Sequence, residues 1–266
     1  MIQRITSAAQ PIPGDELGRL ATPFTNDEVL RGTALRIASD AEASDAARLN
    51  AVMLASELSR RRKPEQRWAL RNLKWRNGLI QGGALTNTTF ISGTIENLTA
   101  RQSSFASVFW GRELSLSNAS FRNVRFDGGG FPGTNAIRLD FLACLFQGVE
   151  IDLANFGLAR FRSMPADPAH PNVVNAGEVC AFENSVIANT AALPAPGTMD
   201  LSNPADEVQF EDVVFTSVHF RGYVKPEWFR NCSFDRCTLP KSINPAALER
   251  RGNRVTDSVY ADEPIY

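Results

Sequence analysis

The sequence has few of the residues on which catalytic and metal sites depend. Only two histidines occur, His170 and His219, and neither has a serine or cysteine with an acidic partner nearby. A nucleophilic site needs such groups beside its base. The four cysteines form no pair at the two-residue spacing of a zinc site. The sequence therefore indicates no catalytic residue, no metal site and no cofactor, and we expect neither an enzyme nor a small-molecule substrate.

Long apolar runs and a strong net charge are missing as well. No stretch reaches the roughly eighteen consecutive apolar residues that a membrane-spanning helix requires. The first residues lack the apolar centre of a secretory signal. The formal net charge of -1 is too small to predict a nucleic-acid partner by itself. We therefore expect a soluble, cytoplasmic protein.

What the chain does have is a large apolar residue at every fifth position. This period begins near Trp75, continues to Phe161, and returns between Phe210 and Leu239. It matches neither the helix period of about 3.6 residues nor the strand period of about 2, so it indicates an internal repeat. Phenylalanine fills many of the centres, and we expect these phenylalanines to form the core: Phe90, Phe105, Phe121, Phe126, Phe141, Phe146, Phe156, Phe161, Phe210, Phe215, Phe220 and Phe234.

The positions around each centre follow a pattern too. The residue two places before a centre is usually small or apolar, and the residue two places after it is often glycine or asparagine, which tolerate tight turns. Each pentad therefore predicts a short extended piece with two inward side chains, followed by a corner. All four cysteines lie two places before a centre, where a free cysteine acts as a small buried hydrophobe: Cys144, Cys180, Cys232 and Cys237.

The pattern is clearest in residues 154–161, Ala-Asn-Phe-Gly-Leu-Ala-Arg-Phe, and in residues 118–126. Here the chain resembles the pentapeptide-repeat family over roughly half its length, although its centres are more often phenylalanine than leucine. The resemblance implies a mainly β fold, a right-handed quadrilateral β-helix in which four pentads make one square coil. A β-sandwich with phenylalanine-rich strands is the alternative, and the five-residue spacing disfavours it.

The N-terminal part of the chain lacks this period. Residues 1–24 contain several prolines and predict an extended or disordered tail. Residues 25–74 predict a helical cap of three helices: one capped by Thr25 or Asn26, one over about residues 44–61, and one that begins at Pro64 and carries Trp68 and Leu73. We expect the third helix to cover the opening coil.

The β-helix itself is expected over residues 75–239. A proline-rich excursion at residues 162–207 interrupts it and indicates an imperfect coil between two loops. Residues 240–266 predict a C-terminal tail or cap with a short helical stretch at 245–251.

One basic segment stands apart from the repeat. It is opposed only by Glu65, is interleaved with Trp68 and Trp75, and consists of Arg60, Arg61, Arg62, Lys63, Arg67, Arg71, Lys74 and Arg76. Two interpretations are open. The cations can belong to a solvated helix end, where they favour the helix dipole, or they can contact an anionic membrane surface or nucleic acid.

Two functions are compatible with these observations. Repeat folds often provide binding surfaces, so the first is a non-catalytic scaffold for protein interactions, with another protein or a second copy of the chain as partner. The family resemblance implies the alternative, since some members mimic duplex DNA and bind DNA gyrase, protecting it from quinolones. That role requires an acidic rod, whereas residues 79–161 hold six basic and six acidic residues. The balance of charge favours the scaffold.

Overall fold

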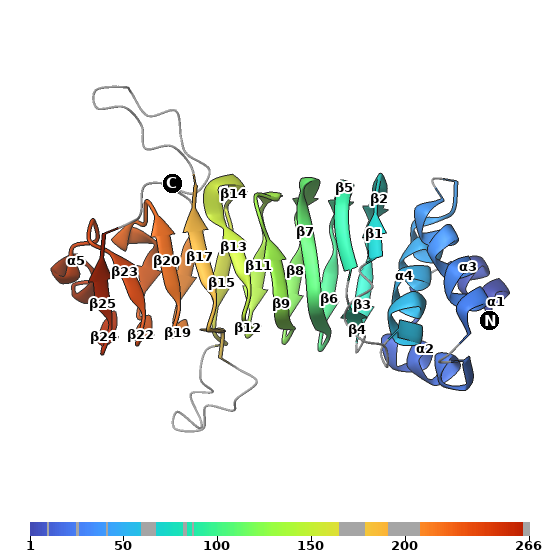
Figure 1. Cartoon of the computed structure of the whole chain (residues 1–266), viewed down its shortest axis with the longest axis horizontal. Helices are drawn as coiled ribbons and strands as arrows, with labels where there is room; N and C mark the ends of the chain where they lie inside the picture. The colour runs from blue at the N-terminus through green and yellow to red at the C-terminus, as the bar shows by residue number, and fades with distance from the viewer. Residues whose placement is uncertain are drawn as a thin grey trace.

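The computed structural model describes residues 1–9, 11–24, 27–40, 42–59, 68–81, 84–86, 88–164, 179–190 and 208–262. In this part of the chain, helices at the N-terminal end are followed by a long stack of parallel strands (Figure 1). None of its helices is both long and apolar enough to cross a lipid bilayer.

The prediction of an extended or disordered tail over residues 1–24 is wrong. That segment forms α1 (Ile2–Ser7), α2 (Gly14–Ala21) and the 3-10 helix η1 (Thr22–Phe24). Ile5 and Leu17 are buried in one apolar cluster with residues of α4 (Asp45–Ser59). Helices this short form mainly through tertiary packing, so their local sequence signal is weak.

The cap helices also differ from the expectation in their ends. Asp27, rather than Thr25 or Asn26, caps α3 (Glu28–Ser39), because its side chain accepts a hydrogen bond from the Leu30 N–H at 2.8 Å. The expected third helix is contradicted where the structure describes it, since Trp68–Leu70 is strand β1 and Leu73–Arg76 is strand β2. Pro64 lies outside the described residues.

Helix α4 takes the place of that third helix at the end of the stack. It lies across the opening coil (Figure 1) and contacts β2 and β4 (Ala84–Thr86). Its apolar residues, among them Leu49 and Met53, join the same buried cluster as Trp75 of the first coil. The helical cap therefore shields the first coil from pairing with another chain.

The strands form the four walls of a square tube. The first wall contains β1, the start of β5 (Thr88–Glu96), the middle of β7 (Ser104–Ser117), the end of β9 (Arg125–Phe131), β13 (Glu150–Asp152), β17 (Val186–Asn189), β20 (His219–Gly222), β23 (Thr238–Pro240) and β25 (Val259–Ala261). The second wall contains β2, the ends of β5 and β7, β10 (Asn135–Ile137) and β14 (Phe156–Gly157).

The two remaining walls complete the square. The third wall contains β3 (Leu79–Gln81), β6 (Thr99–Arg101), β8 (Ser120–Arg122), β11 (Asp140–Leu142), β15 (Arg160–Arg162), β18 (Gln209–Glu211) and β21 (Phe229–Arg230). The fourth wall contains β4, the starts of β7 and β9, β12 (Leu145–Gln147), β16 (Ala181–Glu183), β19 (Val214–Thr216), β22 (Ser233–Asp235) and β24 (Arg254–Thr256).

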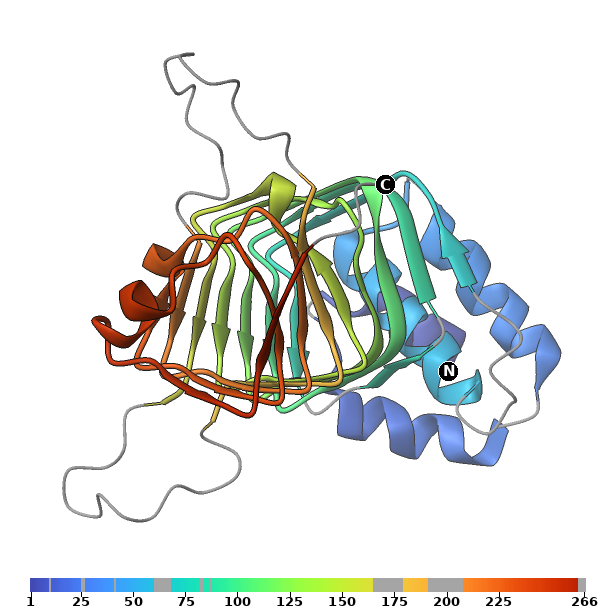
Figure 2. The ribbon, with the colours of Figure 1, turned by 60° about the vertical axis from the view of Figure 1, so that its left-hand side comes forward.

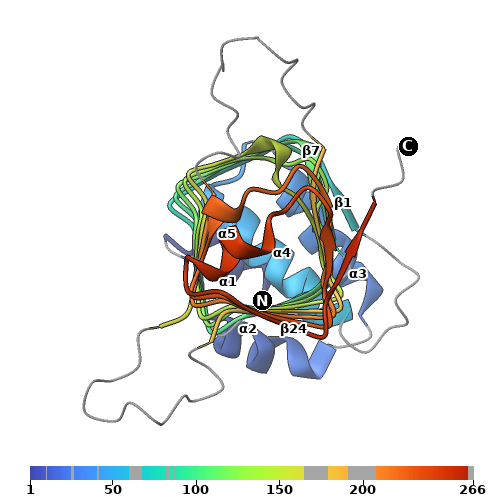
Figure 3. The same cartoon turned by 90° about the vertical axis from the view of Figure 1, so that its left-hand side faces the viewer.

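The register between strands confirms the expected quadrilateral β-helix. All pairs are parallel, and Phe121 lies beside Phe141, which lies beside Phe161, so each of these coils takes twenty residues, or four pentads. Figure 3 looks along the axis and shows the square section. With the C-terminal end toward the viewer, the chain runs counterclockwise as it approaches, which makes the coil right-handed.

The corners lie where the five-residue pattern places them, two residues after each centre. Many of these residues adopt a left-handed backbone, which asparagine tolerates better than most residues. Their N–H groups donate to the next coil, as from Asn97 to the Ser117 carbonyl at 3.0 Å. The corner asparagines with positive φ are Asn72, Asn77, Asn97, Asn118, Asn123, Asn184 and Asn231.

Stacked aromatic rings fill the tube, and all twelve phenylalanines expected in the core are buried. Along the third wall the ring centroids of Phe121, Phe141 and Phe161 are 4.9 and 4.6 Å apart. Along the fourth wall those of Phe146 and Phe182 are 4.3 Å apart and nearly parallel. Such contacts add to the stabilisation that burial of the rings already provides.

Two insertions interrupt the period, and the strands after each of them keep their register with the preceding coil. The expected partial coil is present as β16 and β17, and Phe182 pairs in register with Phe146 although 36 residues separate them. Both expected loops, at about 163–177 and 190–205, lie mostly outside the described residues. After the second interruption one coil is a residue shorter, so Phe229 lies beside Phe210 nineteen residues earlier, and the 3-10 helix η4 (Pro226–Trp228) makes that corner.

The C-terminal segment contains the short helix expected at 245–251 and, in addition, two strands that the sequence did not indicate. The short helix α5 (Pro245–Glu249) buries Leu248, and β24 and β25 then add another layer to the stack. Figure 2 shows α5 and these strands at the end opposite the N-terminal helices. Val255 and Tyr260, five residues apart, take up centre positions, but the helix between them and Leu239 hides the period.

Two glycines give a direct test of this packing. A Cβ at Gly130, where φ is +146°, would lie 1.9 Å from the Glu150 carbonyl oxygen, whereas one at Gly148, where φ is +60°, would meet nothing within 4 Å. We expect Gly130→Ala to lower the free energy of unfolding by about 3 kcal/mol or more, because the backbone of β13 must move. Gly148→Ala should cost only about 1 kcal/mol. Urea denaturation of both variants measures the difference, and equal losses would contradict this packing.

Candidate functional site

The structure places only part of the basic segment. Arg60, Arg61, Arg62, Lys63 and Arg67 lie outside the described residues. Arg71, Lys74 and Arg76 are exposed and belong to the start of the tube, with Lys74 and Arg76 in strand β2 of the second wall. A helix dipole therefore does not account for these three cations. The Nε of Arg76 lies 3.0 Å from the Glu96 carboxylate oxygen Oε2.

A cleft of about 310 Å³ lies where the cap meets the first coil. Its lining includes Asp45, Leu49, Trp75 and Arg76. Beside it the buried Arg48 donates from Nε to the Ala38 carbonyl at 3.1 Å and from Nη2 to the Asn72 carbonyl at 3.3 Å. Burial lowers the pKa of Arg48, while the carboxylates of Asp45 and Asp40 oppose that change. Through its hydrogen bonds to the carbonyls of Ala38 and Asn72, Arg48 connects the helical cap to the first coil of the tube.

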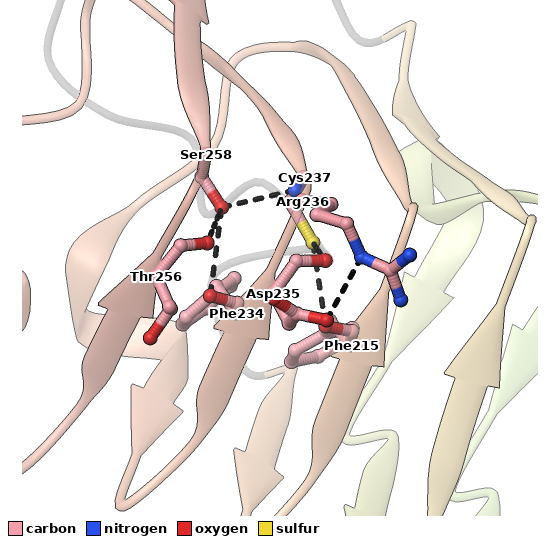
Figure 4. Close-up of polar contacts among 7 residues, drawn as sticks. All are labelled: Phe215, Phe234, Asp235, Arg236, Cys237, Thr256 and Ser258. Carbon is pink, nitrogen blue, oxygen red and sulfur yellow. Dashed lines mark hydrogen bonds and ion pairs between the residues drawn. The ribbon is translucent and has the colours of Figure 1, made fainter.

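The four cysteines are free thiols buried in the walls, as their place in the pattern predicts. Cys144 donates from Sγ to the Phe121 carbonyl at 3.4 Å, and Cys237 donates in the same way to the Phe215 carbonyl at 3.4 Å (Figure 4). Ser258 takes the equivalent place one coil further, where its Oγ donates to the Thr256 carbonyl at 3.0 Å and accepts from the Cys237 N–H at 2.9 Å. Cysteine and serine therefore fill the same position in the repeat.

Burial makes these thiols poor nucleophiles. It raises the pKa of Cys144 and of Cys232 to about 12 and that of Cys237 to about 11. The pKa of Cys180 is raised well above its ordinary value for the same reason. Because the thiolate is the reactive form, a nucleophilic or redox role is disfavoured at neutral pH. Among the described residues, no cluster of three or more histidine, cysteine, aspartate or glutamate side chains could hold a metal ion.

Arginines gather on the third wall and its entering corner. Arg101, Arg122 and Arg160 project from β6, β8 and β15, and Arg138 occupies the corner just before β11. All four side chains are exposed. We call these four residues the arginine strip. It extends over four successive coils, a length of about 14 Å at the usual strand spacing.

The guanidinium groups of the arginine strip are not neutralised by carboxylates of the tube. Within the described part of the chain, none of its four guanidinium groups has an ion-pair partner, and Arg122 contacts only the Met164 sulfur, at 4.0 Å from Nη2. Several arginines elsewhere on the tube are paired with carboxylates at distances of 2.9 to 3.7 Å, as in Arg76–Glu96, Arg125–Asp127, Arg162–Asp140, Arg230–Glu211 and Arg236–Asp235. Others on the described walls and corners, Arg112, Arg221 and Arg254, have no ion pair either, but they do not gather on one wall as the four of the strip do.

Sequence reasoning did not find the arginine strip. Arg101 and Arg122 are neighbours across the coils only because β5 and β7 are shifted in register after Phe90, which makes their spacing 21 rather than 20 residues. The five-residue period alone gives no reason to align Arg101 with Arg122, because it does not show which residues of successive coils are neighbours. The four arginines are spaced by 21, 16 and 22 residues along the chain, so no single period groups them, and only the register of the coils places them on one side of the tube.

Comparisons with known proteins add little to this geometry. No family model and no curated protein sequence matches the chain. One similar solved structure is HetL, a pentapeptide repeat protein involved in heterocyst differentiation regulation from the cyanobacterium Nostoc sp. strain PCC 7120. The identity is 7%, the likeness covers 74% of this chain and 87% of the HetL chain, and the TM-score is 0.20. The strand register therefore establishes the fold without support from this likeness.

Proposed function

We propose that the protein is a non-catalytic scaffold that binds another macromolecule on the outside of its β-helix or on its helical cap. The observation that supports this proposal is the filled interior. Rings such as Phe141 and Phe210 occupy the axis of the tube and are buried, whereas substrate sites are usually concave and partly open. What the fold offers a partner is flat outer walls of rigid strands, the kind of surface that repeat proteins use for binding.

The charge of the third wall argues against mimicry of duplex DNA. Its strands carry five arginines (Arg101, Arg122, Arg160, Arg162 and Arg230) and only two carboxylates, Asp140 and Glu211. A phosphate backbone is imitated by rows of carboxylates, and this wall has the opposite sign. A protein partner that contacts one wall fits this distribution better than an enzyme that normally binds DNA.

Site-specific photo-crosslinking from each surface tests the scaffold proposal. A photoreactive phenylalanine analogue is placed singly at Arg221, Asn135, Gln209 and Arg254, exposed positions on the first to fourth walls, and at Val29 on the cap, which is 80% exposed. We expect one protein to be captured from one or two neighbouring positions in living cells and not from the others. Equal capture from all five positions, or no capture from any, contradicts the proposal.

A further inference from the structure

We propose that the arginine strip binds an acidic protein segment that also carries aliphatic residues. The inference rests on the proposed scaffold function and names the surface and the chemistry of the partner. It starts from the positions of Arg101, Arg122, Arg138 and Arg160, none of which belongs to the basic segment noted in the sequence.

The like charges within the strip are not balanced by the protein itself. Arg101 and Arg122 are register partners on adjacent strands, where two like charges oppose each other. On the same wall Asp140 is the register partner of Arg160, yet its carboxylate accepts hydrogen bonds from Nε and Nη2 of Arg162, at 3.1 and 2.9 Å. The guanidinium groups of the strip are therefore free to bind carboxylates, which they match in a forked geometry.

The apolar surroundings of the strip favour a protein over a nucleic acid. Leu158 at the neighbouring corner is 39% exposed, Ile137 beside Arg138 is 45% exposed, and Leu79 on the third wall is 39% exposed. The Arg138 N–H donates to the Gly157 carbonyl, which places Leu158 next to Arg138 across the coils. Phosphates gain nothing from aliphatic contacts, whereas a peptide can place its own aliphatic side chains there.

The dimensions of the strip suit a short extended segment. Its length of about 14 Å along the axis corresponds to about four or five residues of extended chain. A segment of this length carries two or three carboxylates on one side. A long nucleic acid would instead extend beyond the strip onto the rest of the protein. The formal net charge of the whole protein is -1, so the protein as a whole does not attract a polyanion.

Binding of a synthetic peptide tests the inference. The probe is a fluorescein-labelled 12-residue peptide with four glutamates and three leucines, and its binding is followed by fluorescence anisotropy at about 0.15 M salt. We expect the triple variant Arg101→Gln, Arg122→Gln, Arg160→Gln to bind it at least about tenfold more weakly than the unchanged protein. The matched control Arg125→Gln, Arg236→Gln, Arg254→Gln removes the same charge from the fourth wall and its corner, and should bind within about twofold of the unchanged protein.

Four further measurements keep the result interpretable. Circular dichroism and thermal unfolding check that both triple variants fold. A peptide with glutamine in place of glutamate should not bind, and a labelled single-stranded DNA of 20 nucleotides should bind less tightly than the acidic peptide. No binding of the acidic peptide at about 1 mM, equal weakening by the two triple variants, or tighter binding of the DNA overturns the inference. Crosslinking from another wall alone would do the same and leave the scaffold function standing.

Discussion

Phe210→Asp is expected to prevent the chain from folding into a soluble protein. The ring is 1% exposed, and its centroid lies 4.7 Å from that of Phe161 and 5.2 Å from that of Phe229. Removing a buried phenylalanine side chain costs about 3–5 kcal/mol, and an unpaired carboxylate in its place costs several kcal/mol more. The sum approaches the whole stability of a typical domain, about 5–15 kcal/mol. Soluble expression and circular dichroism measure the outcome.

The adjacent residue supplies the control. Gln209 lies on the same strand, points outward, is exposed, and has Arg160 as its register partner. Gln209→Asp therefore places a carboxylate beside a cation in water, and its free energy of unfolding should stay within about 0.5 kcal/mol of the original. If Phe210→Asp expressed and melted like Gln209→Asp, the inward and outward faces of the strand would have been assigned the wrong way round.

Raising the pH from 8 to 10 is expected to destabilise the protein strongly through its buried thiols. A thiol with a folded pKa near 12 stays protonated while its unfolded form, with a pKa of about 9.0, loses its proton. The folded chain then holds more protons than the unfolded one, so stability falls as pH rises. The loss begins near pH 9 and continues toward pH 12. At pH 10 it amounts to between about 1 and 2 kcal/mol for each of Cys144, Cys232 and Cys237, and Cys180 acts in the same direction.

A variant with all four cysteines replaced by serine isolates this effect. Serine already occupies the same slot at Ser103, Ser185 and Ser258, so the variant should fold. Burial and the nearby Glu249 also raise the pKa of Tyr260, but that group is the same in both proteins. Urea denaturation at pH 8 and pH 10 should show a drop in the free energy of unfolding for the original chain that exceeds the drop for the serine variant by about 3 kcal/mol or more. A drop of the same size in both proteins would rule out the thiols as its source.

The tube could be derived from the sequence because each coil repeats the same local rule. A large ring such as Phe141 must face the axis, and a residue two places later must turn, so pattern and structure agree pentad by pentad. The same rule also holds at one position before Trp75. Leu70 lies five residues before Trp75 and is buried like the other centres, so the first coil starts before the position where the large rings begin.

The parts that escaped prediction depend on contacts between distant residues. Helices α1 and α2 are stabilised by burial of Ile5 and Leu17 in the apolar cluster of the cap. The short sequences of the two helices do not predict these contacts. The arginine strip needs the register shift after Phe90 before Arg101 and Arg122 become neighbours. Surface charge follows no five-residue rule, because outward positions are under no packing constraint.

The insertions between Arg162 and Ala181 and between Asn189 and Gln209 have a consequence for how such a chain can change. Phe182 still pairs with Phe146, and Phe210 still pairs with Phe161, although the chain has extra residues between these strands. The corner between the third and fourth walls and the whole second-wall step of a coil are therefore places where foreign sequence can be grafted, lengthened or exchanged while the flanking strands keep their register. Evolution can vary the length and sequence of such a connection without changing the strands on either side of it.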